Sequence, residues 1–369
     1  MKSFYAVVLT IAFLPIFQSV TVAQGCIAVR HMSSASSSAL FRQQQTGKWL
    51  ATLSYRNLHS YKHFVGTEEQ KQRVEQGTNV INDQHSFDLG LAYQVNPRFS
   101  VAVNLPVSSN ARSSLYEHYG NDAKANPTHA RFSTHSKGIG DARLTAYYWL
   151  VNPAKLKKYN VLMGLGVKLP TGNSNVQDDF HRLAADGHDY TIRKAVDQSI
   201  QLGDKGVGIN VEMQGYWQLS HATALYANGF YLLNPRETNN TLTRGTLTGV
   251  DPNIAYLSVP DQFAARLGIS QTLAFVPGLS LMLGGRVEGV PAHDLIGGSR
   301  GFRRPGYIVS VEPGLMYARP KYAISATVPV ALIRNRTRSY ADLQDPTGQA
   351  HGDAAFADYF VSLSLSRWF

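Results

Sequence analysis

The last nine residues of the chain, Val361–Phe369 (VSLSLSRWF), alternate strictly between apolar and small polar side chains. Val361, Leu363 and Leu365 share one face with the final phenylalanine, and three serines occupy the other face. A period of two is typical of a β-strand whose two faces meet different environments. We therefore expect a strand with an apolar medium on one side and water or polar neighbours on the other.

The same period-two pattern recurs along the chain from residue 47 onward. In 87–95 (FDLGLAYQV) and 163–169 (MGLGVKL), large apolar residues at odd positions alternate with small or polar residues at even positions. We predict about twelve strands, near 47–64, 84–96, 98–110, 138–151, 159–171, 206–219, 223–234, 261–275, 279–290, 306–319, 322–335 and 355–369.

The connections between these segments alternate in length. Short turns such as QVNPRF and ARPKY are followed by long polar loops, for example 111–137 and 172–205. This asymmetry is typical of outer-membrane barrels, and a sheet in lipid must close so that every backbone group is paired. We expect an all-β fold, a closed antiparallel transmembrane β-barrel of about twelve strands with short periplasmic turns and long extracellular loops. The alternative is a soluble all-β sandwich or barrel whose polar face meets the solvent.

The first residues are typical of an export signal. A lysine is followed by an apolar run that is too short to span a bilayer, and then by small residues. We predict a signal peptide over 1–25, a flexible Ser-rich periplasmic extension over 26–46, and the outer-membrane β-barrel over 47–369. Cys26 is the only cysteine, which leaves no internal disulfide; it is either a lipidation site or an ordinary thiol. These features place the protein in the outer membrane of a Gram-negative bacterium.

Phe369 ends the predicted final strand at the periplasmic rim. Outer-membrane barrels commonly end in this way, and the barrel-assembly machinery reads the final strand, although Arg367 stands where a tyrosine is usual. Other aromatic residues near strand ends suit the girdles at the membrane interfaces. They are Trp49, Tyr55, Tyr93, Tyr148, Trp149, Trp217, Tyr317 and Trp368.

Four stretches of the chain resemble a known family. They are YRNLHSYKHFVGT (55–67), GIGDARLTAYYWL (138–150), GLGVKLPTGN (164–173) and VPVALIRNRTRSY (328–340). They are similar to outer-membrane barrels catalogued under the label of a meta-pathway of phenol degradation and described as transporters. The resemblance implies a barrel through which small, aromatic or hydrophobic, molecules cross the outer membrane. It supplies no catalytic residues.

Strand parity assigns charged residues to the inner face of the barrel. Opposed charges in a narrow pore would set a transverse field and select solutes; the alternative is that the pairs neutralise one another and fill the lumen. A barrel of about twelve strands lies between filled eight-stranded barrels and open sixteen-stranded porins. The predicted lumen-lining and selectivity residues are Lys48, Arg56, Arg143, Lys168, Arg266 and Arg286 with Asp88, Asp141, Glu212, Glu288 and Glu312.

Arg334, Arg336 and Arg338 alternate at the extracellular end of a predicted strand. The parity of the preceding apolar residues places all three on the lipid-facing side, where guanidinium groups would bind lipopolysaccharide phosphates. The alternative is a solvated extension of the strand above the membrane. Outer-membrane lipid and lipopolysaccharide are thus the expected partners of this surface.

The sequence offers no cofactor, metal or catalytic motif that we can assign. His59 and His63 lie roughly 13 Å apart on a strand, too far to share a metal, and the His- and Asp-rich loop 178–190 is typical of a solvated loop. The net charge of +10 comes without a nucleic-acid motif. We predict a passive, porin-like channel for small molecules. The alternatives are a barrel enzyme acting on lipids, with a Ser–His pair on its outer wall, and an adhesive or structural surface protein.

Overall fold

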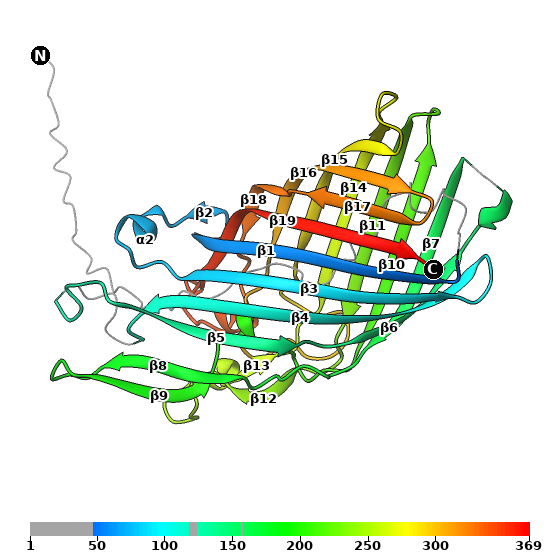
Figure 1. The fold of residues 1–369 in the computed structure, drawn as a ribbon. Coiled ribbons are helices and arrows are strands. Elements are labelled where there is room, and N and C mark those ends of the chain that lie inside the picture. Colours follow the sequence, from blue (N-terminus) through cyan, green and yellow to red (C-terminus); the bar gives the residue numbers. More distant parts are fainter. Residues whose placement is uncertain (1–46, 118–123, 156–157) are drawn as a thin grey trace, which may run out of the picture.

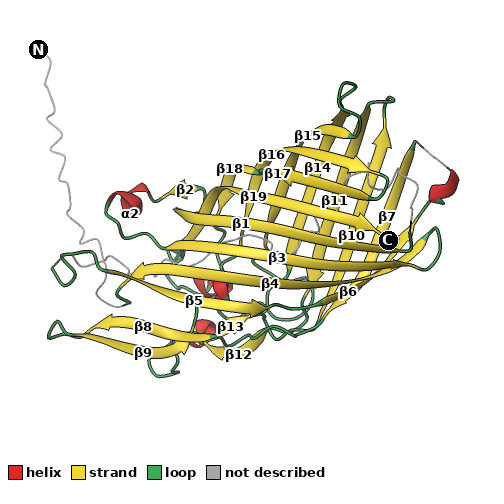
Figure 2. Cartoon of the chain, in the orientation of Figure 1, coloured by secondary structure: helices red, strands yellow, loops and turns green. Residues whose placement is uncertain are grey.

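The computed structural model describes residues 47–117, 124–155 and 158–369. The predicted signal peptide, the periplasmic extension and Cys26 lie outside the described residues. The described chain forms one closed antiparallel β-barrel, drawn as a ribbon in Figure 1 and by secondary structure in Figure 2. No helix among these residues is long and apolar enough to cross a membrane.

Twelve crossings close the barrel, as the alternation predicts. Their sheet contains fifteen strands, but β2 (Glu68–Glu69) is a short extension, and two crossings are each split in two. The crossings are β1 (Trp49–Val65), β3 (Ile81–Gln94), β4 (Phe99–Leu115), β5 (Arg131–Ile139) with β6 (Arg143–Trp149), β7 (Tyr159–Lys168), β10 (Gly208–Gln218), β11 (Thr223–Leu233), β14 (Gln262–Thr272), β15 (Leu279–Val290), β16 (Gly306–Arg319), β17 (Tyr322–Thr327) with β18 (Val330–Asn335), and β19 (Ala354–Trp368).

The first and last crossings close the sheet. Strand β1 pairs with β19 from Leu50 opposite Trp368 to Phe64 opposite Ala354. Closure leaves no strand edge within the lipid, which is the condition for a sheet to span a membrane. The two strands lie side by side in Figure 1, with the C-terminus at the periplasmic rim.

The long connections on the extracellular side carry the remaining elements. The largest is the hairpin of β8 and β9, which continues into η2. The elements are α2 (Lys71–Glu75), β8 (Gln177–Leu183), β9 (Asp189–Ala195), η2 (Gln198–Ile200), β12 (Thr238–Leu242), η3 (Pro252–Ile254), β13 (Tyr256–Ser258) and α3 (Tyr340–Leu343). The periplasmic turns are tight, and one holds η1 (Pro153–Lys155).

The two faces of the strands have the polarity that the sequence predicts. Large apolar side chains cover the outside, for example Leu165 and Leu267, which are 62% and 63% exposed. The serines of β19 face inward, and Ser364 and Ser366 are buried. The apolar outside matches the hydrocarbon layer of a membrane, and the protein is therefore an outer-membrane barrel.

The predicted aromatic girdle is only partly correct. Trp49, Tyr148 and Trp217 are exposed at the periplasmic ends of their strands, where an interfacial girdle lies. Trp149 and Trp368 are buried instead, because their strand parity turns them into the lumen. Proximity to a strand end does not distinguish these two directions, whereas parity does.

The inner face is packed on one wall and open on the other. On the wall of β11, β15 and β16, Tyr226, Met282 and Met316 form a buried cluster. Gly268 and Gly284 make room for this cluster, since a Cβ at either would approach the Tyr226 hydroxyl within 2.4 and 2.6 Å. The opposite wall, β19–β1–β3–β4, carries mostly small inward residues. The empty part of the lumen therefore lies along that wall.

Candidate functional site

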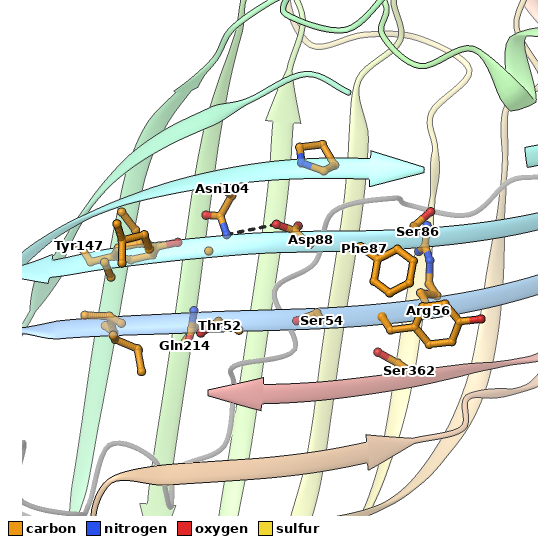
Figure 3. Close-up of a pocket in the computed structure, with 18 of the residues that line it drawn as sticks. Thr52, Ser54, Arg56, Ser86, Phe87, Asp88, Asn104, Tyr147, Gln214 and Ser362 are labelled. Atoms are coloured by element: carbon orange, nitrogen blue, oxygen red, sulfur yellow. Dashed lines mark hydrogen bonds between the residues drawn. The ribbon is translucent and has the colours of Figure 1, made fainter. Parts of the chain in front are cut away.

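A cavity occupies the periplasmic half of the lumen. Figure 3 shows its wall of small polar side chains, among them Thr52, Ser54 and Ser362, with Asn104 donating a hydrogen bond of 3.4 Å to Asp88. Aromatic rings line the rest of the cavity. These are contributed by Tyr147, Trp149, Phe360 and Trp368. The cavity thus combines hydroxyl groups with apolar ring faces.

Charged side chains cross the lumen at the inner end of this cavity. Arg143 is fully buried and lies between two carboxylates, 3.4 Å from Asp88 and 3.7 Å from Glu212. Glu212 also accepts a hydrogen bond of 2.8 Å from the Tyr147 hydroxyl. Three strands thus contribute to one charge network. We call the inward charged residues at this level the charged belt. Its members are Arg56, Arg143, Arg266 and Arg286 with Asp88, Glu212, Glu288 and Glu312.

The second half of the charged belt lies on β14, β15 and β16. Arg266 donates to Glu312 at 2.9 Å, and Arg286 donates to Glu312 at 3.3 Å and to Glu288 at 2.9 Å. All four side chains are buried. Both of these guanidinium groups face carboxylates, so this half of the belt holds its charges in ion pairs.

Aromatic rings lie beside three arginines of the charged belt. The guanidinium groups of Arg56 and Arg286 lie 5.6 and 5.1 Å from the centre of the Phe360 ring. Arg143 lies 5.4 Å from the ring centre of Phe230. A ring in this position attracts a cation through its quadrupole. The sequence analysis missed Phe360, although a large aromatic residue on the serine face of the last strand is a detectable signal.

The three other predicted lumen residues lie outside the belt. Lys168 forms an ion pair with Asp204 and lies 4.0 Å from Asp141. Asp141 accepts hydrogen bonds from the backbone N–H groups of Gly172 and Asp204 at 2.9 and 3.0 Å. Lys48 is exposed at the periplasmic rim, just before β1. The predicted lumen residues therefore fall into three groups. Eight form the charged belt, Lys168 and Asp141 bind the loops near residues 172 and 204, and Lys48 lies at the periplasmic rim.

The barrel wall is interrupted between β5 and β6, and a loop enters the lumen beside this break. The hairpin of β8 and β9 lies beside β5 (Figure 1), and Asp178 of β8 accepts a hydrogen bond of 2.7 Å from the His135 N–H of β5. The chain then turns inward. Close glycine contacts allow this, since a Cβ at Gly203 would lie 2.5 Å from the Gly172 carbonyl oxygen.

Residues 197–204 lie inside the extracellular half of the lumen, and we call this segment the plug. Inward side chains hold its backbone: Gln84 donates to the Ser199 carbonyl at 3.0 Å, and Ser136 donates to the Ile200 carbonyl. Ile200 is completely buried. Polar bonds to the wall and burial of an apolar side chain thus both stabilise the plug.

The plug is anchored by a buried ion pair. Asp197 accepts hydrogen bonds of 2.9 and 2.6 Å from Arg304, and Arg112 lies 3.7 Å away. Burial alone would raise the pKa of Asp197, but the charges of Arg304 and Arg112 outweigh it and hold that pKa well below its usual range. Asp197 therefore remains ionised throughout the physiological pH range.

Leu202 of the plug lies between two cavities. It lines the periplasmic cavity and also a second cavity on the extracellular side, together with Gln84, Lys168 and Arg304. Its side chain is 9% exposed. A displacement of Leu202 would therefore change the connection between the two cavities. The plug was not predicted from the sequence.

The predicted outward direction is wrong for Arg334 and Arg336. A β-bulge at Leu332 shifts the register of β18 against β16. One extra residue moves every later side chain to the opposite face of the sheet. Arg334 consequently shares a face with Ile308, its inward partner.

The contacts of these arginines agree with the corrected direction. Arg334 donates to the Ala357 carbonyl oxygen at 3.1 Å, and Arg336 is buried and donates to Asp342 at 3.1 Å. Arg338 is exposed. Of the three arginines predicted to contact lipopolysaccharide, Arg334 and Arg336 thus point inward, and only Arg338 remains exposed.

The histidines occupy separate environments. His59 lies on the outer wall, 2.5 Å from Asp83, whereas His63 is buried and lies 3.0 Å from Asp353. In the loop 178–190, His181 and His188 each contact a different aspartate. Within the described ranges, no three His, Cys, Asp or Glu residues are placed to hold a metal ion.

The chain is similar in fold to solved outer-membrane channels. Its sequence matches no family model and no curated protein. A crystal structure of an outer membrane channel from Pseudomonas putida F1 aligns over 92% of this chain and 99% of its own, with a TM-score of 0.56 and 14% identity. This similarity supports the barrel fold.

Two further solved structures align more loosely. The CymD monoaromatic hydrocarbon channel aligns over 89% of this chain and 90% of its own, with a TM-score of 0.44 and 12% identity. The Pseudomonas putida toluene transporter TodX aligns over 94% and 98%, with a TM-score of 0.44 and 11% identity.

Proposed function

We propose that this protein is a passive outer-membrane channel for small molecules. The observation that carries the proposal is the cavity in the periplasmic half of the lumen, lined by small polar residues such as Thr52 and Ser54. A barrel with a merely structural or adhesive role would need no such space on its inner side. The opposite wall shows that the same lumen can be packed with large side chains.

The lining of the cavity suggests small, aromatic or hydrophobic, solutes that carry one polar group. Ligand sites are typically apolar with a few placed polar groups. Here the rings of Tyr147, Trp149 and Phe360 offer apolar faces, and Thr52 and Ser54 offer hydroxyl groups. The family resemblance described above implies the same class of solute.

The predicted lumen residues would act as a charge filter in this channel. The charged belt, with four arginines and four carboxylates, would set a transverse field that orients a passing dipole. Lys48 at the rim would add positive charge where solutes leave. The ion pair of Lys168 with Asp204 would hold the plug, and Asp141 would hold its neighbouring backbone.

The plug would control flow through the channel. Leu202 lies between the two cavities, and the close contact at Gly203 fixes its position. Gly203→Val would force the Gly172 backbone away, because the added Cβ would lie 2.5 Å from its carbonyl oxygen. We expect this variant to conduct more than the natural chain.

Single-channel recording tests the proposal. Refolded barrels, verified by a heat-modifiable gel shift, are placed in planar bilayers with and without small phenols in the bath. We expect discrete current steps that phenols reduce, and larger steps for Gly203→Val. Complete absence of current from both folded proteins would overturn the channel function.

A further inference from the structure

A row of polar residues crosses the inner wall of the barrel beside the periplasmic cavity. Ser362 on β19, Arg56 on β1, Ser86 on β3 and Ser108 on β4 are successive register partners, and all four line the cavity. We call these four residues the Arg56 row. Directly opposed side chains lie on one face of a sheet, with Cβ atoms about 4.5–5.5 Å apart. Figure 3 shows Arg56 between Ser86 and Ser362, so its guanidinium lies among serine hydroxyls.

The Arg56 row is accessible from the cavity. All four of its residues are half-buried. The other three arginines of the charged belt, which are Arg143, Arg266 and Arg286, are buried. Of the four belt cations, Arg56 is therefore the one that a solute in the cavity can reach most easily.

The charges that face the cavity near this row are mainly positive. Arg266 and Arg286 line the cavity together with Arg56, whereas Asp88 is the single carboxylate among the described residues of its lining. Asp88 already lies 3.4 Å from the buried Arg143 guanidinium. An excess of one sign of charge on the wall of a narrow space raises the local concentration of the opposite ion. This part of the cavity therefore favours an anion.

Apolar groups border the Arg56 row on its extracellular side. Phe360 precedes Ser362 by two positions on β19 and shares its face, and Leu202 of the plug lines the same cavity. Leu202 lies close to the row, because a Cβ at Gly138, the register partner of Ser108, would approach the Leu202 side chain within 3.0 Å. An anion at Arg56 thus has apolar surface beside it for the rest of the molecule.

A carboxylate joined to an aromatic ring fits both halves of this arrangement. A planar guanidinium can donate to the two oxygens of a carboxylate at once, and serine hydroxyls can donate to the remaining lone pairs. An aromatic ring suits the neighbouring ring of Phe360 and the Leu202 side chain. A bare inorganic anion would bind the guanidinium but leave the apolar surface without a partner.

We propose that the Arg56 row is the recognition site for aromatic carboxylates among the solutes of the channel. The carboxylate accepts hydrogen bonds from the Arg56 guanidinium and the flanking hydroxyls, while the ring packs against Phe360 and Leu202. This inference rests on the proposed channel function and names the polar group that the solutes carry. Because Leu202 lies between the two cavities, a solute bound here also contacts the plug.

The test compares three compounds in single-channel recordings of the refolded full chain at pH 7. Benzoate has both the ring and the charge, benzamide has the shape without the charge, and acetate has the charge without the ring. We expect benzoate to reduce the current at concentrations at least about tenfold lower than either of the others, since hydrogen bonds to a charged group have about this effect on affinity.

Variants of Arg56 identify the group responsible. Arg56→Gln should remove the difference between benzoate and benzamide, and Arg56→Lys, which keeps the charge but not the planar fork, should retain only part of it. Arg193→Gln makes the same charge change as Arg56→Gln on the exposed β9, outside the lumen, and is the matched control. The heat-modifiable gel shift verifies that each variant is folded.

A binding measurement separates this site from the channel function. Benzoate is titrated into the folded barrel in detergent, where no current is needed, and we expect Arg56→Gln to weaken binding at least about tenfold while Arg193→Gln does not. Benzoate binding by a barrel that never conducts would support the site and overturn the channel function. Equal effects of benzoate and benzamide, or of benzoate and acetate, on a conducting barrel would overturn the site alone. Equal binding by the natural chain and Arg56→Gln would also overturn it.

Discussion

Glu312→Gln is expected to make the channel prefer anions. Glu312 is the shared acceptor of Arg266 and Arg286 in the charged belt, and its side chain is buried. The belt has four positive and four negative members, so the substitution leaves one net positive charge at the level of the belt. Glutamine keeps the size of the side chain and a carbonyl acceptor, so we expect the barrel to fold.

The size of the effect follows from Coulomb's law. One charge about 6 Å from a permeating ion in water contributes about 0.7 kcal/mol, raising the barrier for a cation and lowering it for an anion. The two changes together amount to about 1.4 kcal/mol, or a tenfold change in the ratio of anion to cation permeability. Partial exclusion of water from the lumen would enlarge this value.

The assay is the reversal potential of single channels in a potassium chloride gradient. Asp179→Asn makes the same charge change on the exposed β8, outside the lumen, and serves as the control. We expect the reversal potential to move toward the chloride equilibrium potential only in Glu312→Gln. If Glu312→Gln conducts with an unchanged reversal potential, ions do not pass the charged belt and the reasoning fails.

Three further predictions concern the cavity, the plug and the final strand. Ser362→Trp should fill the cavity that Ser362 lines and lower single-channel conductance, whereas Leu363→Trp, on the outer face, should leave conductance unchanged. Asp197→Ala should leave the buried Arg304 without its partner, a loss of about 3–5 kcal/mol, and should open the plug in recordings at pH 7. Because the pKa of Asp197 is lower in the folded state than in the unfolded state, its contribution is complete above about pH 4 and is lost only as pH falls further; conductance of the natural chain should therefore be constant from pH 7 to pH 5. Deleting Phe369, which is 59% exposed, should reduce the amount of barrel in the outer membrane of cells but not refolding in detergent, as a gel shift would show.

The twelve crossings were predictable because lipid and lumen impose opposite polarity on alternate residues. Ser362 and Ser364 of β19 and the glycines of β7 show this directly, since each of these small residues faces inward between two outward apolar residues. Local alternation needs no knowledge of distant contacts. The same reasoning identified all eight members of the charged belt.

The bulge at Leu332 was not predicted, because assigning alternate residues to opposite faces assumes that the strand register is unbroken. A signal was nevertheless present: Leu332 and Ile333 are adjacent apolar residues in a strand that otherwise alternates. Two outward residues in succession are the sequence pattern of a bulge. Recognising it would have turned Arg334 and Arg336 inward.

The plug could not be predicted, because its position depends on distant contacts. Residues 197–204 (DQSIQLGD) are polar and aperiodic, as an exposed loop would be. Their place in the lumen depends on Arg304 and on the approach of Gly203 to Gly172, which are remote in sequence. Only the three-dimensional arrangement brings these groups together.

The two walls of the lumen serve different purposes: one contributes to the stability of the barrel, and the other determines which solutes fit. The wall of β11, β15 and β16 holds interlocked side chains, where a change of volume would disturb neighbours. The wall of β19, β1, β3 and β4 borders empty space, where a larger or differently shaped side chain would alter only what fits. Descendants of this protein could therefore acquire new cargo by substitution along four strands without losing the stability that the other strands provide.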